Sequence, residues 1–220
     1  IEKQVPMDDA SRLKDQKELL PGIISRNIKV SRKISLTEVD KKSLVETINK
    51  SKTCMDCDSR NESHPTPHLG SKFKLMIVMD SPNAGEVDKG KMGQGYASKT
   101  LKQALVLAGF DYKDIYVTSL YKAKKPDSGF TSDMYNGCSA FLTKEIEILK
   151  PPVILSLGSA AHRFLVPGLK GGWEELCGQV HYDGDNDRTI VLGLNPGMVY
   201  FDPSRQSELD KVFQICHDLF

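Results

Sequence analysis

The chain has 220 residues, of which 39% are hydrophobic, and a formal net charge of +1 at pH 7. This length fits one large domain, or one domain with an extension, and the apolar fraction is sufficient for a buried core. The near-neutral charge excludes a strong overall attraction to nucleic acid or to membranes, although a local basic patch is compatible with it. No apolar run reaches the length of a membrane span, and the charged, polar start differs from a signal peptide.

Five cysteines, an odd number, are spread along the chain. In a chain of this size they favour thiols or metal ligands in a reducing compartment over a disulfide framework. We therefore expect an intracellular protein that does not contact a membrane. The five positions are Cys54, Cys57, Cys138, Cys177 and Cys216.

The first 34 residues are polar and charged and have no sustained hydrophobic period. We interpret 1–34 as an N-terminal extension or linker, with a short helix expected over 11–20, and 35–220 as the main domain. Within that domain a helix is expected over 35–50, because apolar residues recur there at helical spacing and Thr37 can cap the first turn. A loop rich in Ser, His and Pro follows.

From residue 74 onward, short apolar runs alternate with amphipathic segments. The predicted strands are 74–79, 115–120, 153–157 and 188–194, and the predicted helices are 98–108, 134–149, 159–164 and 207–219. Continuous apolar strands that alternate with helices are typical of a parallel sheet covered on both faces. The sequence thus predicts an α/β fold, a three-layer αβα sandwich with a central four-stranded, mainly parallel sheet. His162 is expected on the surface of its short helix.

Two of the predicted strands end in turns that contain polar residues. These turns are Asp80-Ser81-Pro82, after the first strand, and Asn195-Pro196-Gly197, after the last. In open α/β sheets, ligands bind beyond the carboxyl ends of the strands, so the two loops are expected to face one cleft. The alternative for Asp80 is a structural one, in which its carboxylate caps a turn at the strand end.

Four short motifs follow one another on these elements. They are Met79-Asp80-Ser81-Pro82-Asn83 with Glu86, Gly90, Gly95, Ala97 and Leu101 after it, Val117-Thr118-Ser119, Pro152 to Leu157 with Gly158 and Ala161, and Asn195-Pro196-Gly197. Each is weak alone, but in this order they resemble the uracil-DNA glycosylase superfamily, specifically its iron–sulfur-containing branch. The resemblance covers 37–220 and leaves the extension outside.

Members of this superfamily flip a uridine out of the duplex and hydrolyse its glycosidic bond, because the target atom is unreachable inside the base stack. By resemblance, Asp80 takes the position that orients the water, where this branch has Glu, and Ser81 and Pro82 lie beside the base. Asn195 takes the place of the His that supports the developing oxyanion, and Pro196 and Gly197 complete that loop.

Two further positions differ from the family pattern. Gly93 falls where the family places an aromatic ring that stacks on the base, an interaction worth about 1–3 kcal/mol, and Tyr96 is a nearby alternative platform. Ser119 falls where an Asn reads the uracil edge, and a hydroxyl cannot present the paired donor and acceptor of an amide. Together with Asp80 and Asn195, these make four positions that differ from the family pattern. Four differences at one site favour the loss of base excision over a change of substrate.

Three cysteines match three of the four cluster ligands of the iron–sulfur branch: Cys54, Cys57 and Cys138. The fourth position holds Ala123, whereas a cubane cluster usually requires four thiolates. His64 and His68 follow the first two cysteines and could complete a Cys3His zinc site. Three alternatives stay open, namely no metal, zinc, or a remnant of a [4Fe–4S] site.

A basic loop follows the second predicted strand, where the family has a basic, proline-containing loop near the DNA backbone. The residues that the resemblance assigns to DNA contact are Lys122, Lys124, Lys125, Met198 and Arg205. Met198 begins an apolar run over 198–201 that could insert into a base step, and ordinary packing is the alternative. With so little net charge, DNA affinity would depend on where these cations lie.

The resemblance implies three functional hypotheses. The first is a DNA-binding domain with weak or lost base excision that serves replication or repair, since such domains occur attached to phage and bacterial replication proteins, including DNA polymerases. The second is an active glycosylase for uracil or a modified pyrimidine. The third is a protein-interaction module of a replication complex. Expected partners are single- or double-stranded DNA and a polymerase or another replication protein, in the cytoplasm or, for a phage-encoded chain, the host cytoplasm.

Overall fold

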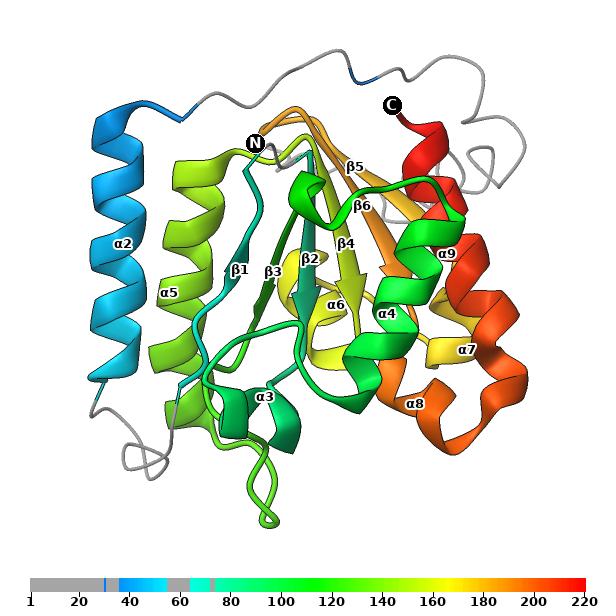
Figure 1. Ribbon diagram of the computed structural model, residues 1–220, viewed down its shortest axis with the longest axis horizontal. Coiled ribbons are helices and arrows are strands. Elements are labelled where there is room, and N and C mark those ends of the chain that lie inside the picture. The colour runs from blue at the N-terminus through cyan, green and yellow to red at the C-terminus, as the bar shows by residue number, and fades with distance from the viewer. Residues whose placement is uncertain (1–29, 31–35, 55–63, 72–73) are drawn as a thin grey trace, which may run out of the picture.

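A computed structural model describes residue 30 and residues 36–54, 64–71 and 74–220, so the helix expected over 11–20 lies outside the described residues. Its six-stranded sheet lies between two layers of helices (Figure 1). The strands are β1 (His68–Leu69), β2 (Leu75–Met79), β3 (Ile115–Ser119), β4 (Val153–Leu157), β5 (Val180–Asp183) and β6 (Arg188–Gly193). They are ordered β1-β3-β2-β4-β6-β5.

The four central strands are parallel, and both edge strands are antiparallel to their neighbours. The predicted α/β sandwich is therefore confirmed, and its four predicted strands form the parallel centre. Every residue of β2, β3 and β4 is buried, as continuous apolar runs require when both faces of a sheet are covered. The edge strands β1 and β5 were not predicted, since one is two residues long and the other alternates buried and exposed positions.

The longer helices form the two outer layers. They are α2 (Glu38–Lys52), α4 (Tyr96–Leu107), α5 (Ser132–Leu149) and α9 (Gln206–Asp218), and the shorter ones are α3 (Ala84–Lys89), α6 (Ser159–Leu165), α7 (Trp173–Leu176) and α8 (Pro196–Phe201). Two 3₁₀ turns, η3 (Tyr112–Asp114) and η4 (Pro203–Arg205), are also present in the described part of the chain. None of the helices in the described part of the chain is both long and apolar enough to cross a membrane.

Alternate residues of the central strands enter two separate cores. In β2, Leu75 and Ile77 pack with α4 and α9, whereas Met76 and Val78 pack with α2 and α5. α2 begins at a capping box, in which the hydroxyl of Thr37 accepts a hydrogen bond from the Asp40 amide, as the sequence predicts.

His162 corrects one expectation, because it is buried with 1% of its surface exposed. Its Nε2 atom lies 3.1 Å from the carbonyl oxygen of Ser156 and 3.0 Å from that of Gly193. Burial lowers the pKa of the imidazole, so a neutral ring with its proton on Nε2 donates to both carbonyls. The side chain thus joins the ends of β4 and β6 beneath the loops that follow them.

Candidate nucleic-acid interface

The loops that carry the predicted site leave the sheet at one edge, which we call the carboxyl edge. Met79 at the end of β2 is paired with Ser119 of β3 and with Leu157 of β4, and Leu157 is paired with Gly193 of β6. The strands therefore end level with one another. The loops that begin at Asp80 and Asn195 therefore leave the sheet at the same edge, and that they face one cleft stays a prediction.

Asp80 is partly buried and contacts the start of α6. Its Oδ1 accepts a hydrogen bond of 2.8 Å from the amide of Ala161. Gly158, at φ 123°, leaves room for this carboxylate, because a Cβ there would overlap it. Burial raises the pKa of Asp80, and hydrogen bonds from the Ala161 and Ala160 amides oppose this increase. The carboxylate thus caps α6 and also lies where the resemblance implies a water-orienting group.

The loop after Asp80 is organised by Glu86, whose role sequence analysis missed. Glu86 is fully buried, and its carboxylate accepts hydrogen bonds from the Asn83 amide at 2.9 Å and the Gly93 amide at 2.8 Å. In return, Oδ1 of Asn83 accepts a hydrogen bond from the Glu86 amide, which completes a capping box at α3. The pattern Asn-x-x-Glu was the available signal for this arrangement. Ser81 is partly buried and Pro82 is buried in the same loop.

Gly93 cannot carry the aromatic platform of the family. Its backbone lies in the left-handed region at φ 74°, and a Cβ there would overlap the hydroxyl of Tyr112. That hydroxyl donates to the Gly93 carbonyl oxygen at 3.3 Å, and the Tyr112 ring stacks on His68 with centroids 3.9 Å apart. Tyr112 therefore occupies the space beside position 93. The side chain of Tyr96, the alternative platform, lies outside the described residues.

Ser119 and Asn195 both form internal hydrogen bonds. Ser119 is buried, and its hydroxyl donates to the carbonyl oxygen of Tyr121 at 2.8 Å. Asn195 is partly buried, and its Oδ1 accepts from the Gly197 amide at 2.8 Å, which caps α8 above Pro196. To donate a hydrogen bond to a base, the Ser119 hydroxyl would have to leave the Tyr121 carbonyl oxygen.

Lys122 corrects the predicted basic patch. Its side chain is only 5% exposed, and its ammonium lies 2.8 Å from the carboxylate of Glu145 on α5. It also donates to the Thr118 hydroxyl and to the Ser119 carbonyl oxygen, each at 2.9 Å. An ammonium with three acceptors inside the protein does not reach phosphate. Lys124 and Lys125 are exposed and are the lysines of this loop that can do so.

The other two predicted contacts lie around α8. Met198 packs against the core, whereas Tyr200 and Phe201 are 50% and 85% exposed, so the exposed aromatic rings follow the predicted residue. Arg205 pairs with Asp202 at 3.0 Å, and its guanidinium lies 4.2 Å from the ring centroid of Trp173. A contact between Arg205 and DNA stays a prediction.

Two of the predicted ligand cysteines line a narrow cavity beside the base of the β3 loop. Cys54, His64, Ala123 and Cys138 line it, and the Lys122 amide donates to Cys138 Sγ at 3.3 Å. Ala123 offers no donor atom, so a cluster held by four cysteines does not fit these residues. Within the described ranges, no three His, Cys, Asp or Glu side chains form a metal-binding group, and Cys57 lies outside them.

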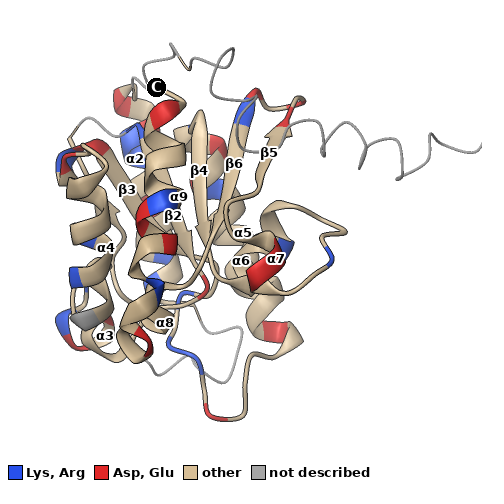
Figure 2. Ribbon diagram, turned by 90° about the vertical axis from the view of Figure 1, so that its right-hand side faces the viewer, with Lys and Arg blue, Asp and Glu red and all other residues tan. Residues whose placement is uncertain are grey.

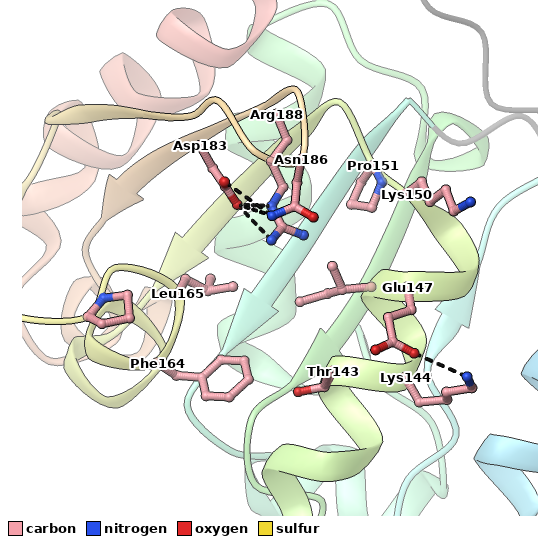
Figure 3. A pocket seen from close by; sticks show the side chains of 12 residues that line it. Thr143, Lys144, Glu147, Lys150, Pro151, Phe164, Leu165, Asp183, Asn186 and Arg188 are labelled. Carbon is pink, nitrogen blue, oxygen red and sulfur yellow. Dashed lines mark hydrogen bonds and ion pairs between the residues drawn. The ribbon is translucent and has the colours of Figure 1, made fainter.

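A large cavity lies elsewhere (Figure 3). It has a volume of about 790 Å³ and lies between the end of α5, the end of α6 and the β5–β6 hairpin. Arg188 and Asp183 form an ion pair of 2.7 Å on one side of it, and Phe164 and Leu165 lie on another. None of the predicted site residues lines this cavity.

Comparison with known proteins agrees with this arrangement. Residues 67–214 match the model of the uracil DNA glycosylase superfamily. The chain is 28% identical to a type-4 uracil-DNA glycosylase of Archaeoglobus fulgidus, over 80% of this chain and 93% of that protein. It is also 29% identical to a DNA polymerase III subunit alpha of Yersinia pestis, over 94% of this chain but only 17% of that protein. It is 32% identical to a DNA polymerase of Bacillus phage SP01, over 61% of this chain and 16% of that protein. The chain therefore belongs to the uracil-DNA glycosylase superfamily.

Proposed function

We propose that this chain is a DNA-binding domain that serves replication or repair and whose base-excision activity is weak or lost. One observation carries the proposal: the groups expected to act on a base are engaged within the protein. Asp80 caps α6, Ser119 donates to a backbone carbonyl, and Asn195 caps α8. Gly93 adds no ring, and Tyr112 fills the space beside it.

DNA binding is supported by the exposed residues of the same edge. Lys124 and Lys125 provide cations for phosphates, and Tyr200 and Phe201 provide apolar rings on α8. The names of the two similar polymerases support a link to replication, with a polymerase or another replication protein as the partner. Such a role places the domain inside the cell, in the cytoplasm or the host cytoplasm.

An active glycosylase is the second candidate, and the environment of Asp80 favours it. Burial raises the pKa of this carboxyl at the carboxyl edge, which is a property of many catalytic acids and bases. In that case Asp80 orients the water that attacks the glycosidic carbon of a uracil or modified pyrimidine nucleotide. Asn195 has an amide nitrogen that can donate to the leaving base.

A gel assay on purified protein separates these candidates. Single-stranded and duplex oligonucleotides with one uracil or one 5-hydroxymethyluracil are incubated with the wild type, Asp80→Asn and Asp80→Ala, and abasic sites are cleaved with alkali. We expect binding of the oligonucleotides without cleavage above that of the Asp80→Ala control. Cleavage by the wild type that is lost in both variants would establish the glycosylase instead.

Absence of DNA binding by all three proteins would overturn both candidates. The third hypothesis, a protein-interaction module, would then remain. It predicts that the purified domain captures a replication protein and that this capture is insensitive to the replacement of Lys124 and Lys125.

A further inference from the structure

A surface of aromatic and basic side chains extends from the loop after β3 across α5 to α6, and of its residues the proposed function uses only Lys125. We call it the aromatic–basic band and define it by Lys125, Phe130, Tyr135, Arg163 and Phe164. In Figure 2 the loop between β3 and α5 projects beyond the sheet and carries both basic and acidic residues.

The first half of the band is built on a ring stack. Phe130 lies face to face with Tyr121, with centroids 3.6 Å apart and planes 4° from parallel. The ammonium of Lys125 lies 5.8 Å from the centroid of the Phe130 ring. Because Tyr121 is buried and Phe130 is partly exposed, the stack holds the Phe130 ring in a fixed orientation beneath an exposed cation.

The second half joins two helices. Tyr135 on α5 is 40% exposed and contacts Phe164 on α6 edge to face, with centroids 6.3 Å apart. Arg163 is exposed on α6, where its guanidinium donates to the carbonyl oxygen of Ser159 at 3.2 Å. This half therefore repeats the composition of the first, an accessible ring beside an accessible cation.

Both halves lie beside Asp80. The Tyr121 amide donates to the Asp80 carbonyl oxygen at 2.9 Å, and the Ala161 amide of α6 donates to its carboxylate at 2.8 Å. Arg163 and Lys125 both lower the pKa of Asp80, although burial raises it by more. Asp80 thus contacts both the segment that begins the first half and the helix that carries the second.

Rings beside cations, without side chains placed to read base edges, are the features of surfaces that bind single strands. Bases of a duplex are already stacked on one another and cannot stack on Phe130 or Tyr135, whereas unpaired bases can. The band also contains two exposed carboxylates, Asp127 in the loop and Asp133 at the start of α5. Both repel phosphate, so we assign the phosphate contacts to the two cations of the band, Lys125 and Arg163.

We propose that one unpaired DNA strand crosses the aromatic–basic band past Asp80, with bases against Phe130 and Tyr135 and phosphates at Lys125 and Arg163. This inference rests on the proposed function and adds the form of DNA that the domain holds. It assigns the strand to the α5 and α6 side of the carboxyl edge.

The test measures equilibrium binding of a labelled oligothymidine of about 16 nucleotides, and of the same strand in a duplex. Tyr135→Leu removes an exposed ring, and Arg163→Gln removes an exposed cation. Tyr182→Leu on β5, where the ring is 54% exposed, and Lys42→Gln on α2 are matched controls. All four positions are on the surface, and thermal melts verify that each variant is folded.

We expect Tyr135→Leu to weaken binding of the single strand about tenfold. Arg163→Gln should lower the slope of log affinity against log salt by about 0.7. The controls should bind like the wild type, and the duplex should bind more weakly than the single strand to every protein.

Equal losses for band and control variants, or a wild type that prefers the duplex, would overturn the inference and leave the proposed function intact. A wild type that binds neither form would overturn the proposed function itself. Capture of a partner protein that depends on Tyr135 and Arg163, with oligothymidine binding unchanged, would identify the band as a protein interface and contradict the inference.

Discussion

The loops after β2 and β3 leave the sheet from paired strands, and they are built in opposite ways. The first folds onto its own buried carboxylate, Glu86, which accepts hydrogen bonds from two backbone amides of that loop. The second is held by Lys122 at its base and by the stack of Phe130 on Tyr121, and it projects from the sheet (Figure 1) with Lys124 and Lys125 exposed. The first loop carries residues expected to act on a base and is held by its own hydrogen bonds, and we call it the closed loop. The second loop is expected to contact the DNA backbone and leaves its lysines accessible to a ligand, and we call it the open loop.

The largest expected effect tests the base of the open loop. Lys122→Met leaves the Glu145 carboxylate buried without its cation, which should lower the free energy of unfolding by about 3–5 kcal/mol. Urea denaturation measures this loss. The double variant Lys122→Met/Glu145→Leu removes both charges and should recover most of it, and equal losses in the single and double variants would contradict the pairing.

A smaller loss is expected in the closed loop. Both carboxylate oxygens of Glu86 accept from backbone amides, and Glu86→Gln replaces one of these oxygens with an NH₂ group that cannot accept. The free energy of unfolding should therefore fall by about 1–3 kcal/mol. Urea denaturation also applies here. Glu46→Gln on α2, an exposed position, is the control. A Glu86→Gln variant as stable as this control would show that the carboxylate does not hold the loop.

The tip of the open loop should affect binding and leave stability alone. Lys124→Gln/Lys125→Gln should change the free energy of unfolding by no more than about 0.5 kcal/mol. On single-stranded DNA it should reduce the salt slope by about 1.4, since two phosphate contacts are lost. Lys42→Gln/Lys50→Gln on α2 is the matched control, and an unchanged slope in the loop variant would exclude phosphate contact.

The pH dependence of the free energy of unfolding reports on Asp80, which begins the loop after β2. Because burial raises its pKa above 3.8, the folded protein holds this proton to higher pH than the unfolded chain does. Its stabilising contribution is therefore present below 3.8 and is lost as pH rises through the folded pKa. Relative to Asp80→Asn, the wild type should gain unfolding free energy as pH falls from neutral towards 3.8, and a relative loss would contradict the raised pKa.

The smallest effect concerns metal removal. Because Ala123 interrupts the cysteine set, we expect purified protein to hold iron well below one cluster per chain and its melting temperature to be unchanged by a chelator. Elemental analysis and thermal melts check this. One equivalent of zinc, with a lower melting temperature after chelation, would instead establish a site that includes Cys54, Cys138 and a further ligand.

The sheet could be predicted from sequence because parallel strands buried on both faces are continuous apolar runs, as in β2 and β4. The inward direction of the Lys122 side chain could not be predicted, because a lysine at the end of a strand is expected on the surface until its buried partner is known. A signal was present in α5, where Glu145 shares the buried face with Cys138, Leu142 and Leu149. A carboxylate among such neighbours requires a buried partner, but the sequence does not identify which cation supplies it.

The position of the candidate site could be predicted from the sequence, but the hydrogen bonds that its side chains form could not. The motifs place Asp80, Ser119 and Asn195 at one edge, and the strand register agrees. The hydrogen bond of Asp80 joins segments far apart in the chain, because its partner Ala161 is 81 residues away. Those of Ser119 and Asn195 are to residues two positions further on, and they depend on the local turn geometry that follows each strand.

The Tyr112 hydroxyl beside Gly93 couples the side chains that these two positions can hold. An aromatic side chain at position 93 would need both a different backbone conformation and the space of the Tyr112 hydroxyl. A substitution at position 93 alone would therefore displace the Tyr112 ring and disturb its stack on His68. To place a stacking ring at this edge of the sheet, both positions would have to be redesigned together.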